Sequence, residues 1–418
     1  MTSSDHAPSV TRTAWLVVIL LMPVALLNYL DRQMLATMKT SVMNDIPTIG
    51  SKENWGYVLG VFKWVYAGLS PFAGYIADRF GKRYTICGSL FVWSAITWWT
   101  GHVQTFNELL WARGLMGVSE AFYFPAALAL IADYHTGGTR SRAIGMHQIA
   151  IYIGQITGGF GGYVADAPSL GWRFALDSCG VFGMLYAIPL VMYLRDVRRS
   201  EAAAAAPKAS VKENLTEIMT NRSYILLVLY FTLPALAGWV VRDWMPSILK
   251  DKFHLQQGIA GLAATAPWQV AAIASAIFGG WLSDFWMQRN IRGRTFVSAI
   301  GMGCIVAAIF GVGNAGTLAM AVSFLAIFGI GWGFFDCNNM PILSQIVRPQ
   351  LRATGYGFMN FVSISCGGVA DWLFGKLQDK GVPLNIIFGI FASAAIISVF
   401  LVLSIKPKAE LSTGAAEG

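Results

Sequence analysis

Charged residues are scarce in this chain of 418 amino acids, in which Asp, Glu, Lys and Arg together make up 12%. A soluble globular protein carries about 25%. Since 55% of the residues are hydrophobic, the chain cannot cover a water-facing surface, which excludes an ordinary soluble domain. Cysteine is scarce as well. The five cysteines lie inside apolar stretches and form no close CxxC pair, so they predict neither a disulfide framework nor a zinc site.

Other protein classes are excluded by features that are missing. The first 12 residues are polar, and no short apolar stretch with a small-residue cleavage site follows, so we expect no removable signal peptide. No nucleophile–base set or metal-ligand cluster occurs, which argues against an enzyme, and we expect no cofactor and no metal. The clustered glycines at 158, 159, 161 and 162 indicate close helix packing, because no strand precedes them as in a nucleotide site.

Twelve apolar stretches are long enough to cross a bilayer, which takes about 20 residues. They cover approximately 13–38, 56–77, 84–103, 107–134, 140–164, 173–194, 223–249, 260–287, 295–313, 316–346, 351–376 and 383–405. The sequence therefore predicts an all-α membrane protein with twelve transmembrane helices in two pseudo-symmetric six-helix bundles. These bundles would be residues 13–194 and 223–405, with a linker at 195–222 and tails at 1–12 and 406–418.

The distribution of Lys and Arg predicts the orientation. With the N-terminus in the cytoplasm, 19 of the 30 fall in cytoplasmic segments, seven on or near the other side, and four inside spans. This bias predicts a multi-pass inner-membrane protein with both termini in the cytoplasm. It also explains the net charge of +8 without any nucleic-acid partner.

A short motif occurs once in each predicted bundle. GYIADRFGKR (74–83) follows the second span, and GGWLSDFWMQRNIRGR (279–294) follows the eighth. The first copy, GxxxDRxGKR, resembles the signature loop of the major facilitator superfamily, and the second is a degenerate copy. The resemblance implies a twelve-helix transporter fold with a conformational latch, for which the candidates are Asp78, Arg79, Gly81, Lys82, Arg83 and, in the second copy, Asp284.

Three further segments resemble a narrower family, the anion:cation symporters. They are NYLDRQMLA (28–36), ARGLMGVSEAFYFPA (112–126) and GFMNFVSISCGG (357–368). That family includes bacterial galactonate, hexuronate and glucarate transporters and the vesicular and lysosomal anion transporters of animals. The resemblance implies that Tyr29 and Arg32 bind the substrate, and that this substrate is an organic anion.

Ionisable residues inside a membrane are costly and mark functional pathways. We count four acids and four bases within the predicted spans, so the interior could be neutral without a ligand: Asp31, Arg32, Lys63, Arg113, Glu120, Arg242, Asp243 and Asp336. Arg32 is the first candidate for binding a substrate carboxylate, because a guanidinium grips a carboxylate with two hydrogen bonds. Alternatively, Arg32 locks Asp31 or reaches toward a lipid head group.

Glu120 is the expected proton carrier, because a low-dielectric surrounding favours the neutral form of a carboxyl group. It stands seven residues after Arg113 on the same helix face, so a cap or an ion pair with Arg113 is the structural alternative. The resemblance implies that Asp31 pairs with Arg113 across the bundle and also takes part in proton coupling.

Several polar residues are weaker candidates for substrate contact. Lys63 could contact a second carboxylate or a hydroxyl, or it could neutralise Asp336 or Asp31, and Tyr66 would share its cavity. The remaining candidates are His147, for which packing is the alternative, and Gln148, Asn339 and Asn360. We expect Arg242 and Asp243 to form an ion pair or gate near the end of the seventh span.

The leading prediction is a proton-coupled symporter of a sugar acid such as an aldonate or hexuronate. Protons would neutralise Glu120 and Asp31, and the freed Arg32 would then attract the anion while the two bundles alternate. The partners would be a small organic anion, protons and the lipid bilayer, and the protein would act as a monomer. The alternatives are a carrier of a smaller or aromatic carboxylate, a drug or cation exporter, and a membrane sensor without transport.

Overall fold

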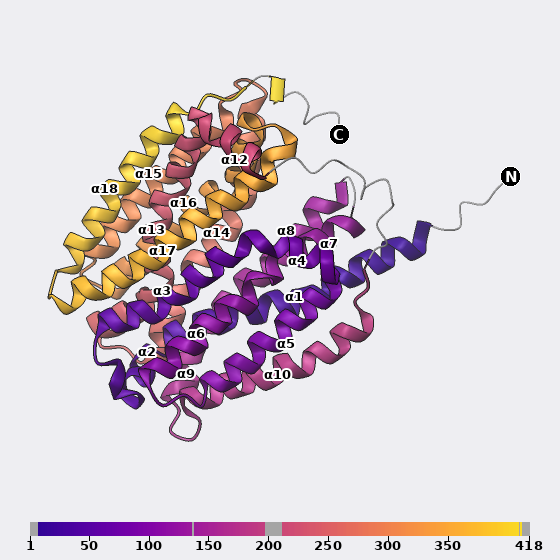
Figure 1. The fold of residues 1–418 in the computed structure, drawn as a ribbon. Helices are drawn as coiled ribbons and strands as arrows, with labels where there is room; N and C mark the ends of the chain where they lie inside the picture. Colours follow the sequence, from indigo (N-terminus) through magenta and orange to yellow (C-terminus); the bar gives the residue numbers. More distant parts are fainter. Residues whose placement is uncertain (1–6, 136–137, 197–210, 409, 412–418) are drawn as a thin grey trace.

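The protein was analysed as a computed structural model that describes residues 7–135, 138–196, 211–408 and 410–411. Within these residues the secondary structure is helical and no strand occurs (Figure 1). The prediction of an all-α protein is therefore confirmed.

The first six predicted spans are all helices, and we call them the first half. The long helices are α1 (Ala7–Thr37), α3 (Lys52–Leu69), α5 (Lys82–Thr100), α6 (Phe106–Ala121), α7 (Tyr123–Tyr134), α8 (Gly138–Gly159) and α10 (Gly171–Tyr193). Short helices lie between them: α2 (Lys39–Asp45), α4 (Ala73–Phe80) and α9 (Gly161–Asp166). The span predicted at 107–134 is the pair α6–α7. It is interrupted because Pro125 has no N–H to donate to the carbonyl of Ala121.

The last six spans, the second half, are single helices. They are α13 (Arg222–Phe253), α14 (Gln257–Met287), α15 (Gly293–Asn314), α16 (Leu318–Ile346), α17 (Arg352–Asp379) and α18 (Leu384–Ser404). The short helix α12 (Val211–Thr220) precedes them, and the middle of the predicted linker, 197–210, lies outside the described residues. In the described residues, eight spans are apolar enough to cross a membrane by length and composition. The other four predicted spans, α3, α5, α8 and α17, do not meet this criterion.

The two halves pack mainly through α3 with α17, α8 and α9 with α14, and α1 with α13. Figure 1 shows the beginning of α1 toward the right and the C-terminal end of α18 toward the top, and we call this the termini side. The opposite end, at the lower left, carries α2 and α9, and we call it the far side.

The far side is closed by direct contacts between the halves. The side-chain nitrogen of Gln257 donates to the hydroxyl of Ser41 and to the carboxylate of Asp166, each over 2.7 Å. The carboxylate of Asp379 accepts from the backbone N–H of Lys52 over 3.1 Å. Taken over the described residues, the hydrogen bonds between the halves lie in the middle of the bundle or toward the far side. The structure is therefore in a conformation closed on the far side.

Candidate functional site

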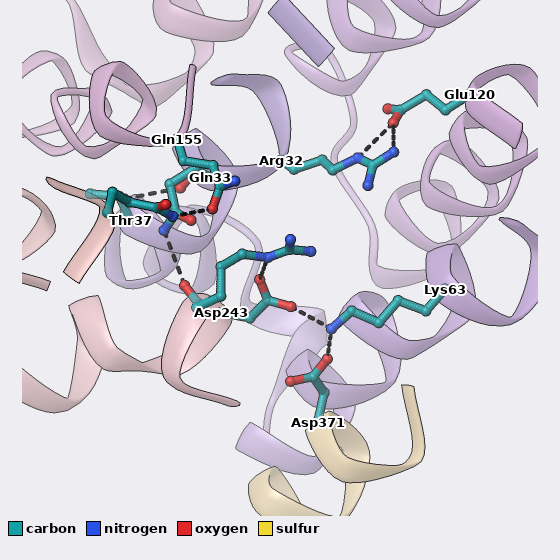
Figure 2. Close-up of polar contacts among 10 residues, drawn as sticks. Arg32, Gln33, Thr37, Lys63, Glu120, Gln155, Asp243 and Asp371 are labelled. Atoms are coloured by element: carbon teal, nitrogen blue, oxygen red, sulfur yellow. Dashed lines mark hydrogen bonds and ion pairs between the residues drawn. The ribbon is translucent and has the colours of Figure 1, made fainter. Parts of the chain in front are cut away.

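Arg32 and Glu120 form a buried ion pair between α1 and α6. Nε of Arg32 donates to Oε2 of Glu120 over 2.7 Å, and Nη2 lies 2.5 Å from the same oxygen (Figure 2). The Glu120 side chain is fully buried and that of Arg32 is 10% exposed. Two of the nitrogens that could grip a ligand carboxylate are thus bound to a carboxylate of the protein. Neither structural alternative is found, since Arg32 does not lock Asp31 and Glu120 does not pair with Arg113.

Three aromatic rings surround the Arg32 guanidinium. Its central carbon lies 4.9 Å from the ring centroid of Tyr29, 4.6 Å from that of Phe62 and 5.2 Å from that of Tyr66. Ring faces attract a cation without neutralising it, so they hold the guanidinium while leaving its charge available. Sequence reasoning named both tyrosines and missed Phe62. The spacing of four residues to Tyr66 could have found it, because residues four apart share a helix face.

The predicted ion pair between Asp31 and Arg113 is not formed. Asp31 faces α5, where its Oδ2 accepts from the hydroxyl of Thr97 over 3.0 Å. Arg113 faces α3 instead, and its central carbon lies 4.5 Å from the ring centroid of Phe62. Its Nη1 contacts the sulfur of Met116 over 3.1 Å, and its Nε has no hydrogen-bond partner in the described part of the chain. Arg113 is therefore a buried cation beside the pair of Arg32 and Glu120.

Lys63 of α3 joins two helices of the second half. Its amine contacts the carboxylates of Asp243 on α13 and Asp371 on α17 (Figure 2). Nε of Arg242 lies 3.4 Å from the other oxygen of Asp243, as expected for an adjacent ion pair. The prediction that Lys63 neutralises Asp336 or Asp31 is wrong, because the side of α3 that carries Lys63 packs against α17 and α13.

Sequence reasoning missed Asp371, although it lies inside the span predicted at 351–376. The rule that marks an ionisable residue at membrane depth as functional would have selected it. With Asp371 added, the set of interior charges holds five acids and four bases rather than four of each. The interior would be neutral only if one of these carboxyl groups carried a proton.

Tyr29 contacts an arginine from each half. Besides Arg32 of its own helix, the guanidinium of Arg242 lies 5.9 Å from the Tyr29 ring centroid and 4.0 Å from that of Trp239. An aromatic residue three positions before an arginine thus occurs on both α1 and α13. This internal repeat also escaped sequence reasoning, because the flanking residues differ.

The remaining substrate candidates are His147 and Gln148 on α8, in the first half, and Asn339 and Asn360 on α16 and α17, in the second half. His147 is fully buried, and its Nε2 lies 2.9 Å from the hydroxyl of Tyr123, an arrangement typical of a packing residue. Gln148 is half-buried beside it. Asn339 is fully buried, and neither atom of its amide has a hydrogen-bond partner among the described residues. Asn360 donates to the carbonyl of Tyr356 over 3.2 Å within its own helix.

Asp336, whose role the sequence left open, connects the halves. Its Oδ2 accepts from the hydroxyl of Tyr152 on α8 over 3.4 Å. Asp336 stands five residues before Pro341, as Glu120 stands five residues before Pro125. The two acids therefore occupy matching places in the two halves.

The candidate latch residues contact their own half. The backbone N–H of Arg83 donates to Asp196 over 2.9 Å, and the amine of Lys82 contacts Asp133. Gly81 has a φ of 88°, which favours glycine, and Asp284 pairs with Arg294 over 2.7 Å. Arg79 is exposed, and the side chain of Asp78 lies outside the described residues.

Twelve helical spans with charges buried between two halves, together with the family match, define this chain as a membrane transport protein rather than an enzyme. Residues 21–370 match the family model described as the Major Facilitator Superfamily, and the chain belongs to this superfamily. Its members generally act as monomers that transport small substrates.

The named relatives are distant. The Probable L-galactonate transporter of Escherichia coli is 26% identical over 92% of this chain and 88% of its own length. Protein spinster of Drosophila melanogaster is 24% identical over 89% of this chain, which spans 63% of spinster's length. A crystal structure of a bacterial homolog of the human lysosomal transporter Spinster, in an inward-facing and unoccupied conformation, has a TM-score of 0.73 at 20% identity. That comparison covers all of this chain and 98% of the other.

Proposed function

We propose that this protein is a proton-coupled symporter of an organic anion and that the anion is a sugar acid. The ion pair between Arg32 and Glu120 is the observation that carries the proposal. It places the most suitable anion-binding side chain directly against a buried carboxylate that can take up a proton. The ionised carboxylate of Glu120 and a substrate carboxylate are therefore alternatives for the same guanidinium.

The proposed cycle follows from this competition. A proton on Glu120 removes the charge that holds Arg32, and Arg32 then offers its guanidinium to a substrate carboxylate. The loaded carrier keeps its central charges compensated while the halves alternate. When the substrate leaves, Glu120 releases its proton and pairs with Arg32 again. Asp31, which accepts one hydrogen bond from Thr97, is the second proton site in this scheme.

Sugar acids fit the polar groups around this pair. Tyr29 and Tyr66 lie beside Arg32 and supply hydroxyl groups for the hydroxyls of an aldonate or hexuronate, and we propose the amides of Asn339 and Asn360 as further contacts. The resemblance of the Probable L-galactonate transporter over 92% of this chain supports the same class.

An aromatic or amphiphilic carboxylate is the second candidate, favoured by the three rings around Arg32. Relatives named Sphingosine-1-phosphate transporter SPNS2, 24% identical in Xenopus tropicalis and 26% in Mus musculus, support an amphiphilic anion. A thermal-shift panel of sugar acids, aromatic acids and lysophospholipids separates the two classes.

For orientation, we propose that the termini side faces the cytoplasm and that the protein lies in the inner membrane. The excess of Lys and Arg in the segments on the termini side supports this assignment. The conformation described above is then closed toward the outside.

Glu120→Gln tests the proposal. The amide keeps the shape of the side chain but never binds or releases a proton, so proton-driven accumulation of the anion should fall to the background level. Arg32 is no longer held by a charge, so anion binding and counterflow exchange should persist. Both are measured in proteoliposomes with a radiolabelled sugar acid at an imposed pH gradient.

Glu217→Gln is the matched control, because Glu217 forms a half-exposed surface pair with Arg348. It should leave the response to the pH gradient unchanged. Full proton-driven accumulation in Glu120→Gln would overturn the proposed coupling. A wild-type protein that binds no organic anion would overturn the proposed substrate class.

A further inference from the structure

A cavity of about 490 Å³ lies on the far side, apart from the site around Arg32. It lies between the segment α2–α3 of the first half and the far-side ends of α13, α15, α17 and α18. Three amines are among its lining groups: those of Lys39, Lys52 and Lys252. The rim residue Lys252 is exposed, whereas Lys39 and Trp244 are buried.

Lys39 is the unusual member of this cavity. The residue is 6% exposed, and its amine lies 4.5 Å from the ring centroid of Trp244. No carboxylate of the described residues lies within ion-pair distance of this amine. Asp251 is the carboxylate that lines the cavity, and it lies 3.7 Å from the amine of Lys250. The lining therefore carries three positive charges and one negative charge.

Burial of a cation without a counterion is unfavourable. Lys39 lies beyond the membrane span that ends at Thr37. Its pKa is lowered to about 8, mainly by burial and in part by the neighbouring charge of Lys52. Lys250 acts in the same direction, whereas Asp251 and Asp379 oppose the shift. An anion bound in the cavity would supply the missing counterion.

We propose that this cavity is an outer binding site for the carboxylate of the transported sugar acid, occupied before the anion reaches Arg32. Polar groups for the sugar hydroxyls come from Ser247, Asn314, Gln378 and Asn385. The buried Trp244 supplies a ring face, and the volume is within the range of small-molecule sites. The identity of the anion rests on the proposed function, whereas the site rests on its own residues.

The cavity is adjacent to the charges that join the halves. Trp244, which lines it, directly follows Asp243, the acid that contacts Lys63. An anion in the cavity would lie on the outer side of the Lys63 contacts, and Arg32 lies on the inner side. The outer site therefore holds an anion at the entrance of the path that opens when the halves separate on the far side.

Titration of purified full-length protein with sodium D-galactonate tests this inference. The Arg32→Ala variant removes the principal ligand of the central site, so the binding that persists reports the outer site. We expect Arg32→Ala to retain binding. The double variant Arg32→Ala/Lys39→Gln should bind at least tenfold more weakly. Lys252→Gln in the Arg32→Ala background should weaken binding less, and this rim variant serves if Lys39→Gln fails to fold.

Lys380→Gln is the control, because Lys380 is an exposed far-side lysine that does not line the cavity. It should bind like its parent. If the wild type binds galactonate and Arg32→Ala binds none, the outer site is wrong and the proposed function stands. If the wild type itself binds none, the proposed function fails. Displacement by inorganic phosphate at equal concentration would overturn a site selective for hydroxy acids.

The pH dependence of this binding is a second readout. An anion binds the protonated amine of Lys39, so affinity in the Arg32→Ala background should be full below pH 8 and fall as the pH rises through about 8. Lys39→Gln should remove this dependence. An affinity that is equal at pH 7 and pH 9 would contradict the role of Lys39.

Discussion

Arg32 has one carboxylate partner and three ring partners, and these two kinds of contact do different things. The rings of Tyr29, Phe62 and Tyr66 hold the guanidinium in place by its charge and shape. Glu120 neutralises it. A residue held by rings keeps its position when its carboxylate changes, so a substrate carboxylate can replace Glu120 without rebuilding the site.

Arg32→Lys separates charge from shape. The amine keeps the positive charge but loses the planar fork that contacts Glu120 through two nitrogens and lies against three rings. We expect the affinity for the anion to fall at least about tenfold, which is about 1.4 kcal/mol. Isothermal titration of the sugar acid measures this change.

Arg32→Ala should weaken binding to the central site further. An Arg32→Lys protein that binds as tightly as the wild type would mean that charge alone recruits the substrate.

At the level of residues, the sequence identified the buried charged positions better than it predicted their partners. Arg32, Glu120 and Lys63 were selected because charges at membrane depth are rare. Their partners depend on which helices pack together, and that is decided by contacts far apart in the chain. Hence the predicted pair of Asp31 and Arg113 was wrong. Asp371 was missed for another reason, because the rule on charges at membrane depth was not applied to it.

Among the helices, α3 and α17 approach closely because glycines line their contact. A Cβ placed on Gly60 of α3 would lie 2.9 Å from the carbonyl oxygen of Gly368 on α17. Only a residue without a side chain allows this distance. The small residues therefore determine how tightly the far side closes.

Gly60→Val should push α3 away from α17. Overpacking at such a contact costs about 1–3 kcal/mol, so both the melting temperature and the population closed on the far side should fall. A cysteine placed at Ser41, which bonds to Gln257 across the closed far side, would then react faster with a membrane-impermeant maleimide.

Gly88→Val is the control, since nothing lies within 4 Å of a Cβ at Gly88. Equal labelling rates in the two variants would show that this contact does not limit closure.

Hydropathy predicted that the long helices exist, but it did not predict the residues at which they begin and end. The span predicted at 223–249 is part of α13, which runs from Arg222 to Phe253. It starts there because the Asn221 side chain accepts from the N–H groups of Ser223 and Tyr224, a cap that hydropathy does not register. The short helix α2 was not predicted, because it is too short to read as a span, whereas α9 begins inside the span predicted at 140–164.

In the whole molecule, Lys63 is the side chain that ties the first half to two helices of the second. Opening the far side requires this amine to leave both Asp243 and Asp371. Removing one partner of a buried ion pair costs about 3–5 kcal/mol, because a buried charge is left without a counterion.

Lys63→Met should therefore lower the melting temperature and raise maleimide labelling at a cysteine placed at Ser41. Asp371→Asn added to Lys63→Met removes the carboxylate that was left alone and should restore part of the stability. A double-mutant cycle over these variants measures the coupling. If the effects of Lys63→Met and Asp371→Asn on the melting temperature are additive, Lys63 and Asp371 do not interact.

The twelve-helix fold was predictable because a bilayer imposes the length and apolar character of each span. The conformational state was not, since it depends on the balance between contacts at the two sides of the molecule. That balance includes the bonds of Gln257 and Asp379, which lie at the ends of α14 and α17, outside the spans predicted at 260–287 and 351–376.

The exchange of carboxylates at Arg32 has an electrical consequence. Whether Arg32 holds Glu120 or a monovalent substrate beside a protonated Glu120, the charge at the centre of the membrane is the same. A cycle with one proton per anion then moves no net charge, and a membrane voltage of 100 mV, worth about 2.3 kcal/mol per charge, adds nothing to accumulation. If accumulation of the anion depends on the membrane voltage, more than one proton moves with each anion. In the proposed scheme Asp31 binds the second proton.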